Sequence, residues 1–210
     1  MKKESMSPKE RWLAVLQRKT PDRIPMDYWG TSEITAKVLK HLGVSSRQEM
    51  DAKLHIDSPL TVTPKYNGPA LAEGENIWGV ITKTVDYGSG TYDECSNHPL
   101  ADFETVDDIK KNYKFPTADL FDYTVIKSQI KGNEHRPIRG GGSEPFLMYK
   151  YLRGDEQAFM DLIINPEIVH YCMEQMYSFC YENTRRIYEA IPGQVLISYV
   201  AEDMGSQESL

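Results

Sequence analysis

The sequence predicts an α/β fold in which short parallel strands alternate with helices. Three observations lead to this prediction: apolar extended runs alternate with amphipathic segments, the amphipathic segments carry helix caps, and no flexible linker or repeat interrupts the order. Strands that alternate with helices are joined by right-handed crossovers and lie parallel. With 210 residues, the chain can bury a sizeable core, so residues 1–210 are expected to form one domain.

The first strand and helix are expected in the N-terminal fifth of the chain. Ser7, Pro8 and Glu10 form a capping box, which predicts an amphipathic helix over "SPKERWLAVLQRK". Prolines flank "TPDRIPMDYWG", which predicts a strand that ends in Asp27-Tyr28-Trp29. The helix pattern of "SEITAKVLKHLG" follows and is closed by Gly43. These segments make the first strand and helix unit.

The middle of the chain is expected to add a second strand and a hairpin. "KLHIDSPLTVTPKY" is a second extended segment with Asp57 at its first break. Alternating residues on either side of Gly88-Ser89-Gly90 predict a β-hairpin, which is a peripheral excursion. Thr105 and Asp108 cap a short helix, and "DYTVIKSQIKG" predicts another.

The last third predicts two further strands and several helices. "RPIRGGGS" is the third strand, helices broken near Gly154 follow, and a long helix then runs from Pro166 to about Pro192. The apolar run Val195–Val200 is the fourth strand. Four strands are half of the eight in a TIM (β/α)8 barrel of roughly 250 residues. The sequence therefore predicts a TIM barrel truncated to about its first half.

Composition excludes several classes of function. The net charge of −7 argues against a nucleic-acid partner or an anionic membrane surface. No apolar run approaches the roughly eighteen residues of a membrane helix, and the start lacks a signal-peptide pattern. Three cysteines without paired spacing fit a reducing compartment. We therefore expect a cytoplasmic protein.

Acidic residues recur where the predicted strands end, which is where barrel active sites lie. They are Asp27, Asp57, Glu202 and Asp203. A partly desolvated carboxylate at such a place has a raised pKa and can donate a proton or bind a substrate N–H. Capping of the next turn by Asp57 and Asp203 is an equally good interpretation. Tyr28 and Trp29 are expected to pack in the barrel rather than to stack on a ligand.

The stretch "RGGGS" suggests a ligand surface. It matches neither the dinucleotide-binding fingerprint nor the Walker spacing. We therefore expect Gly140 and Gly141 to let the backbone approach a flat ligand closely, and Arg139 to provide a guanidinium group for charged contacts. A loop that needs positive backbone angles explains the glycines equally well. His170 and Cys172 lie two apart on a helix, about 200° from each other, so they do not converge on a zinc ion.

Several successive blocks resemble the uroporphyrinogen decarboxylase superfamily. They are "MSPKERWLAVLQRKTPDRIPMDYWG", "IWGVITKTVDYGSGTYDECSNHPLADFETVDDI", "FLMYKYLRG…FMDLIINPEIVHYCMEQM" and "AEDMGSQESL". The superfamily includes the heme-pathway decarboxylase and methylcobalamin:coenzyme M methyltransferases, which are longer α/β barrels. The resemblance implies a single domain of this type, 1–210, that is incomplete at its C-terminus.

The resemblance also implies roles for individual residues. Asp57 is the nearest match to the substrate-binding aspartate of the decarboxylase, and Tyr151 matches its active-site tyrosine better than Tyr149 does. The expected catalytic residues are therefore Asp57, Tyr151 and Asp203. The expected substrate-binding residues are Asp27, Arg139, Gly140, Gly141 and Glu202. Two departures stand out, because the arginine-rich turn after the first strand is missing and Glu202 replaces a serine.

Loss of the arginine turn favours the methyltransferase branch, since uroporphyrinogen carries eight carboxylates. The resemblance then implies a small-molecule substrate, methyl transfer from a methylcorrinoid (methylcobalamin) to a thiol acceptor, a corrinoid protein as partner, and a catalytic zinc whose ligands lie outside this chain. Two alternatives remain open. One is a uroporphyrinogen decarboxylase, which needs no cofactor, and the other is a truncated half-domain without catalysis of its own.

Overall fold

A computed structural model describes residues 4–88 and 90–202. The chain packs as two compact units, and each unit is assembled from three separate stretches. The first unit takes residues 4–64, Tyr123–Gly140 and Ile187–Ser198. The second takes Lys65–Asp122, Gly141–Arg186 and, of the described residues, 199–202.

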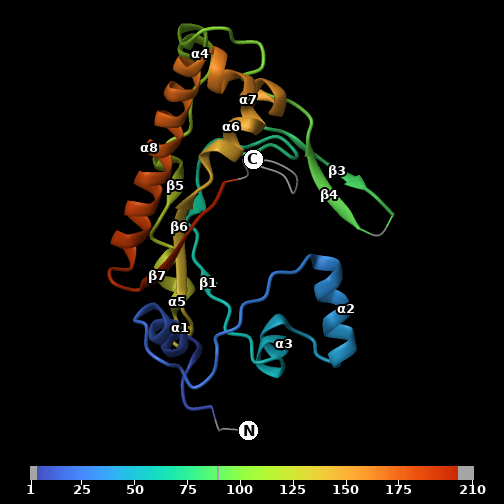
Figure 1. Cartoon of the computed structure of the whole chain (residues 1–210), viewed down its shortest axis with the longest axis vertical. Coiled ribbons are helices and arrows are strands. Elements are labelled where there is room, and N and C mark those ends of the chain that lie inside the picture. Colours follow the sequence, from blue (N-terminus) through green and yellow to red (C-terminus); the bar gives the residue numbers. More distant parts are fainter. Residues whose placement is uncertain (1–3, 89, 203–210) are drawn as a thin grey trace. The chain divides into compact units, whose positions relative to one another are not determined.

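Short helices and a parallel strand pair build the first unit (Figure 1). Its helices are α1 (Pro8–Leu16), α2 (Ser32–Leu42), α3 (Arg47–Lys53) and α5 (Ile126–Ile130). Its strand β1 (Leu60–Thr61) pairs in parallel with β6 (Ile138–Ser143), and β7 (Val195–Val200) completes the sheet order β1-β6-β7. The boundaries between the units fall within β6 and β7.

An aliphatic cluster stabilises the first unit. It brings together one residue from the segment after β1, two from α5, one from β6 and two from around the end of α8 (Pro166–Ala190): Val62, Ile126, Ile130, Ile138, Ile187 and Ile191. Burial of each such side chain contributes about 1.5–3 kcal/mol. This cluster fixes β6 and therefore the position of Arg139, which is the second residue of that strand.

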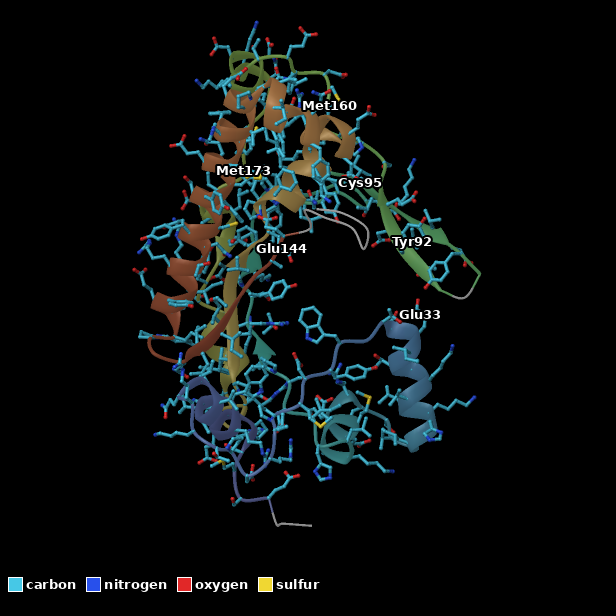
Figure 2. The ribbon with its side chains drawn as sticks, viewed as in Figure 1. Glu33, Tyr92, Cys95, Glu144, Met160 and Met173 are labelled. Carbon is cyan, nitrogen blue, oxygen red and sulfur yellow. The ribbon has the colours of Figure 1, made fainter. Side chains whose placement is uncertain are left out.

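Helices dominate the second unit. Its helices are α4 (Val106–Asn112), the 3-10 helix η1 (Ala118–Leu120), α6 (Pro145–Arg153), α7 (Asp155–Ile164) and most of α8. Its strands are β2 (Lys65–Tyr66), β3 (Thr82–Asp86), β4 (Thr91–Cys95) and β5 (Phe121–Asp122). β3 and β4 form an antiparallel hairpin, with Cys95 at its base and Tyr92 farther along its length (Figures 1 and 2).

The core of the second unit lies where α6 and α7 pack against the first half of α8 (Figure 1). Phe146, Tyr149 and Leu152 of α6 contribute to it, as do residues of α8, of α7 and α4 and of the segments before them: Ile168, Val169, Cys172, Met176, Ala158, Ile109, Trp78, Val80 and Leu100. Asp161 of α7 is fully buried in the same region. Its carboxylate accepts hydrogen bonds from Tyr149 Oη and Arg153 Nε, both at 2.7 Å, so the buried charge is paired.

Most of the predicted elements are confirmed. The capping box of α1, the left-handed Gly43 after α2, the hairpin strands, the break at Gly154, the long helix and the last strand all form as expected. The predicted parallel pairing is confirmed for β1 and β6. The described residues form a mixed α/β structure with a three-stranded sheet, and the barrel itself stays a prediction.

The predicted first strand is wrong, because residues 24–29 form no ladder. Side chains take the backbone donors that a ladder would need: Met26 N–H donates to the Asp57 carboxylate at 3.0 Å, and Tyr28 N–H donates to Asp27 Oδ1 at 2.8 Å. Helix α3 was not predicted, since only Met50 of its residues is buried and no apolar period marks it.

No helix within residues 4–88 and 90–202 combines the length and the apolar character needed to cross a bilayer.

Candidate functional site

A pocket of about 680 Å³ lies within the first unit, and we call it the Trp29 pocket. Its wall comes from the segment before α2, from α3, and from the residues around the starts of β1 and β6. The lining residues are Asp27, Tyr28, Trp29, Gly30, Thr31, Arg47, Gln48, Asp51, Ser58, Pro59, Arg136 and Arg139. The structure thus brings two of the predicted substrate-binding residues, Asp27 and Arg139, into one cavity.

The Asp27 carboxylate is held by three donors. Oδ1 accepts from Tyr28 N–H at 2.8 Å and from Ser58 Oγ at 2.5 Å, and Oδ2 accepts from the Trp29 indole N–H at 2.7 Å. Partial burial opposes ionisation, but the hydrogen bonds from Ser58, Trp29 and Tyr28 outweigh it and hold the pKa of Asp27 below its ordinary value. The expectation of a raised pKa at this position is therefore wrong, and Asp27 is suited to accept hydrogen bonds rather than to donate a proton.

Trp29 does not pack in a core, contrary to the sequence-based expectation. Its side chain is 67% exposed, and the Arg139 guanidinium carbon lies 5.8 Å from its ring centroid. The neighbouring Tyr28 ring is half-buried and is covered by the Arg47 guanidinium at 4.4 Å. Both distances are within the range of cation–π contacts. The pocket wall therefore includes two aromatic rings, and each lies next to a positive charge.

Three arginines line the pocket, and each makes a different contact. Arg47 Nε pairs with Asp51 Oδ1 at 2.6 Å, one helical turn along α3. Arg136 Nη2 donates to the carbonyl oxygen of Ser58 at 3.0 Å, and Arg139 Nε donates to Thr61 Oγ1 at 2.9 Å. Only Arg139 was predicted from the sequence, because nothing local in the sequence joins Arg47 and Arg136 to it.

Asp57 is buried in an ion-pair network. The side chain is 1% exposed, and its carboxylate accepts from Arg11 Nη1 at 2.8 Å, Arg23 Nη1 at 2.5 Å and Met26 N–H at 3.0 Å. Asp57 also precedes β1, so it lies at the amino end of the parallel pair and not at the carboxyl end that the sequence predicted. This geometry gives Asp57 a positioning role for the segment that carries Asp27 and Trp29.

Arg11 and Arg23 were missed by sequence reasoning. Arg11 is 1% exposed and also pairs with both carboxylate oxygens of Asp22, through Nε at 2.6 Å and Nη2 at 3.0 Å. The side-chain hydrogen bond from Arg11 is the main cause that depresses the pKa of Asp22 far below its ordinary value. An arginine beside the apolar Trp12 of an amphipathic helix was the available signal.

The glycines of β6 face protein atoms. A Cβ on Gly140 would lie 2.9 Å from Ile187 Cγ2 and 3.0 Å from Val62 Cγ2, within the first unit. Gly141, in the second unit, has φ +70°, and its Cβ would lie 2.6 Å from Thr184 Oγ1. The space over both residues is filled by side chains of this chain. These contacts correspond to the alternative interpretation, close packing and a positive backbone angle, rather than to a flat ligand.

Tyr149 and Tyr151 differ sharply in exposure within the second unit. Tyr149 is fully buried and donates to Asp161, and burial is the main cause that raises its pKa far above the ordinary value. Tyr151 is 37% exposed. Of the two candidates in "MYKYLRG", Tyr149 therefore braces the α6–α7 pair, while Tyr151 remains accessible to a ligand.

Glu202 caps a helix. Its carboxylate accepts from Phe146 N–H at 3.0 Å and Leu147 N–H at 3.1 Å, in the first turn of α6. Helix α6 otherwise has no side-chain cap at its N-cap residue, Glu144, which Figure 2 labels. A carboxylate at this position accepts hydrogen bonds from backbone N–H groups that have no partner within the helix, and its negative charge interacts favourably with the helix dipole. Asp203 lies outside the described residues.

The environment of Cys172 and Cys180 in the second unit favours the neutral thiol over the thiolate. Burial raises the pKa of Cys172 to about 12 and that of Cys180 to about 11, which disfavours the thiolate that a metal binds. Across residues 4–88 and 90–202, no group of three His, Cys, Asp or Glu side chains is placed to hold a metal ion. The chemistry of the described donors thus does not fit a zinc site.

Comparison with known proteins shows the fold. No family model matches the sequence, and no curated protein does. Among solved structures, the chain is similar to a methyltransferase from Methanosarcina mazei, with a TM-score of 0.57 and 15% sequence identity. The match covers 98% of this chain and 62% of that one. The chain thus shares the fold of a methyltransferase while spanning less than two thirds of its length.

Proposed function

We propose that this protein is an α/β-barrel methyltransferase of the uroporphyrinogen decarboxylase superfamily that moves a methyl group from a methylcorrinoid to a thiol acceptor. The observation that carries the proposal is the structural match to a methyltransferase over 98% of the chain. The ordered blocks of sequence resemblance support the same superfamily. The corrinoid would be presented by a partner protein.

The Trp29 pocket is the proposed binding site for the small substrate. Its volume of about 680 Å³ lies within the range of about 300–1,000 Å³ that small-molecule sites occupy. Asp27 orients the Trp29 indole, and Asp57 fixes the segment that carries both residues. These residues bind and position. Tyr151 and Asp203 stay proposed catalytic residues.

The described residues do not fit the zinc ion that the methyltransferase resemblance implies. Methyl transfer to a thiol needs a thiolate, and a zinc ion, if one were bound, would supply it by lowering the pKa of the thiol. Zinc ligands would have to come from outside residues 4–88 and 90–202.

One observation favours uroporphyrinogen decarboxylation as the second candidate. The arginine-rich turn is missing from the sequence, but the structure brings Arg47, Arg136 and Arg139 to one pocket from three other places in the chain. Guanidinium groups bind carboxylates bidentately, so this cluster could hold acidic side chains of a porphyrinogen. Asp27 and Asp51 in the same wall reduce that positive charge.

The test is a turnover assay on the 210-residue chain, and on the same chain extended by any reading frame that follows Leu210. Each is incubated with methylcobalamin, zinc and coenzyme M, and the methylated thioether is measured by mass spectrometry. Methylated product supports the proposal. Conversion of uroporphyrinogen to coproporphyrinogen would instead establish the second candidate.

A non-catalytic half-domain gives a different result. Both forms would fold cooperatively and yield neither product. Arg139→Gln and Arg185→Gln provide matched variants, because Arg139 lines the pocket whereas Arg185 lies on α8 paired with Glu182 at 2.7 Å. If the pocket holds the substrate, the first variant raises the KM for the thiol and the second leaves it unchanged.

A further inference from the structure

The β3–β4 hairpin of the second unit forms a sheet of its own. Its two strands pair only with each other, and the hairpin projects from the second unit (Figure 1). Every side chain of the two strands is exposed or half-buried. A two-stranded hairpin is only marginally stable in water, whereas a third strand or a packed face adds stability. An added strand would therefore stabilise this hairpin.

The alternation of the ladder decides which backbone groups of the hairpin face outward. Ser96 N–H donates to the Ile81 carbonyl oxygen at 2.8 Å, and Tyr87 N–H donates to the Gly90 carbonyl oxygen at 3.1 Å. The register is continuous between these two pairs, and hydrogen-bonded pairs alternate with non-hydrogen-bonded ones in an antiparallel ladder. The N–H and C=O groups of three β4 residues therefore point away from β3: Thr91, Asp93 and Cys95.

The two outer edges of the hairpin differ in how they are covered. On the β3 side, Thr82 N–H donates to the Gly74 carbonyl oxygen at 3.0 Å. On the β4 side, the outward N–H groups of Thr91, Asp93 and Cys95 have no acceptor among residues 4–88 and 90–202. β4 also contains no proline that would block pairing. A strand edge with free donors and acceptors is a template for a further strand.

The charges beside this edge are mainly negative. The Asp93 carboxylate accepts from Thr84 Oγ1 at 2.8 Å, and the Glu94 carboxylate accepts from Tyr92 Oη at 2.7 Å. Both donors are neutral hydroxyl groups, so neither bond neutralises a carboxylate. The strands carry three acidic residues against one basic residue, Lys83, which lies opposite Glu94 in the ladder.

This charge decides which kind of strand fits the edge. If β4 of a second copy paired antiparallel about its central residue, the two Asp93 carboxylates would lie directly opposite each other. Like charges in opposite positions destabilise a sheet, whereas opposite charges stabilise it. A strand with Lys or Arg beside Asp93 and Glu94 is therefore favoured. A β-branched residue opposite Tyr92 would pack against its ring.

We propose that the outer edge of β4 binds an extended, basic segment of a partner protein, which joins the hairpin as a third, antiparallel strand. The main-chain groups of this segment pair with Thr91, Asp93 and Cys95, and its Lys or Arg side chains lie next to Asp93 and Glu94. The edge belongs to the second unit and the Trp29 pocket to the first, so this proposal does not depend on methyl transfer.

The probe is the end-blocked peptide Thr-Val-Lys-Arg-Val-Thr-Thr, and its control is Thr-Val-Glu-Glu-Val-Thr-Thr. In the proposed register the lysine lies opposite Glu94 and the arginine opposite Asp93. Binding to the isotope-labelled full chain is measured from amide chemical shifts in NMR titrations. We expect the basic peptide to bind at least about tenfold more tightly than the acidic one. We also expect this difference to shrink as salt is added.

Hydrogen exchange and methylated peptides test the main-chain pairing. In the free protein, the amides of Asp93 and Cys95 should exchange faster than those of Tyr92 and Glu94, and the basic peptide should slow them. N-methyl groups on the second, fourth and sixth residues of the peptide remove the N–H groups that face β4, so binding should be lost. N-methyl groups on the third and fifth residues face away and should leave most of the affinity.

Variants of the chain locate the site. Asp93→Pro removes one outward N–H and leaves the ladder with β3 intact, and it is expected to weaken peptide binding by at least about tenfold. Asp93→Asn keeps the backbone, removes the charge and should weaken binding by about threefold or more. Asp107→Asn, at an exposed side chain of α4, should leave binding unchanged. Melting curves and the amide shifts of Tyr87 show whether each variant keeps its hairpin.

Three results would overturn the inference. They are equal affinity for the basic and acidic peptides, unchanged binding in folded Asp93→Pro, and amide shifts that do not change at millimolar basic peptide. A dimer of the chain that Asp93→Pro dissociates would also overturn it, because the edge would then belong to a second copy.

Discussion

The guanidinium of Arg11 contacts the carboxylate of Asp57 at 2.8 Å across 46 residues of sequence, and both side chains are about 1% exposed. A second guanidinium, from Arg23, contacts the same carboxylate at 2.5 Å. The site that carries Asp27 and Trp29 is therefore held in place by a buried charge network between α1 and the segment before β1.

Replacing Asp57 tests whether this network is structural. Asp57→Asn leaves Arg11 buried with less compensation, and loss of one partner of a buried pair costs about 3–5 kcal/mol. Urea unfolding should show this loss. The control is Asp119→Asn. Asp119 pairs with Arg186, but its side chain is 75% exposed, so a loss of only about 0–1 kcal/mol in the free energy of unfolding is expected. Full stability together with lost substrate turnover would instead make Asp57 catalytic.

The buried Asp161 predicts acid sensitivity of the second unit. Burial disfavours its charge, but hydrogen bonds from Arg153, Asn165, Tyr149 and Gln157 outweigh it and lower its pKa to about 2. A lowered pKa in the folded state contributes stability above the ordinary carboxyl range, and this contribution is lost as the pH falls through about 2.

The measurement is urea unfolding between pH 5 and pH 2. Asp161→Asn should be less stable at pH 5, and its free energy of unfolding should fall less steeply with acid than that of the wild type. Asp107→Asn, at a side chain that is 95% exposed, should run parallel to the wild type. If the free energy of unfolding of Asp161→Asn fell between pH 5 and pH 2 as steeply as that of the wild type, Asp161 would not be the source of the acid sensitivity.

Two glycines with positive φ separate backbone strain from crowding. Gly43 has φ +65° with nothing within 4 Å of an added Cβ, whereas Gly142 has φ +125° and its Cβ would lie 1.9 Å from the Tyr199 carbonyl oxygen. Gly43→Ala should cost about 1–2 kcal/mol. Gly142→Ala should cost at least about 1–3 kcal/mol more, because backbone must also move. Equal melting temperatures would show that residues 142 and 199 do not pack this closely.

Glu202 gives a prediction about α6. Glu202→Gln keeps the shape of the side chain but weakens its bonds to Phe146 N–H and Leu147 N–H, and loss of a cap costs about 0.5–2 kcal/mol. Circular dichroism during thermal unfolding measures the change. A variant with native stability but weaker ligand binding would show that Glu202 binds substrate, as the sequence predicted.

Thiol labelling tests the interior of the second unit. Cys172 is fully buried with a pKa raised to about 12, so a disulfide reagent at pH 8 should modify it only as the protein opens. Half-buried Cys95 should react first, and peptide mapping identifies the order. Labelling of native Cys172 at the rate of a denatured thiol would contradict its burial.

Local signals made most of the elements predictable from sequence. The capping boxes of Ser7 with Glu10 and of Thr105 with Asp108 join groups three residues apart, and both form as expected. Gly43 and Gly154 end helices because each adopts a positive φ that other residues rarely take. Donor and acceptor lie within one turn in each case, so tertiary packing does not decide the outcome.

The site was predictable only in part. Asp27 and Arg139 were named and do share a pocket, but Arg47 and Arg136 join them through contacts that no local pattern records. Asp57 was placed at the wrong end of its strand because the paired residues, Leu60 and Thr61, come after it. The acidic residues could be named from the sequence, whereas their hydrogen-bond partners and their places relative to the strands depended on chain segments far away.

The division into two interleaved units has a consequence for biosynthesis. The first unit takes its final stretch from Ile187–Ser198, which includes Ile191 of its aliphatic cluster, and the second unit also draws on residues after Tyr199. Domains commonly fold one after another as they emerge from the ribosome. Here neither unit has all of its parts until translation has passed residue 198, so both cores stay unfinished until nearly all of residues 1–210 have been synthesised.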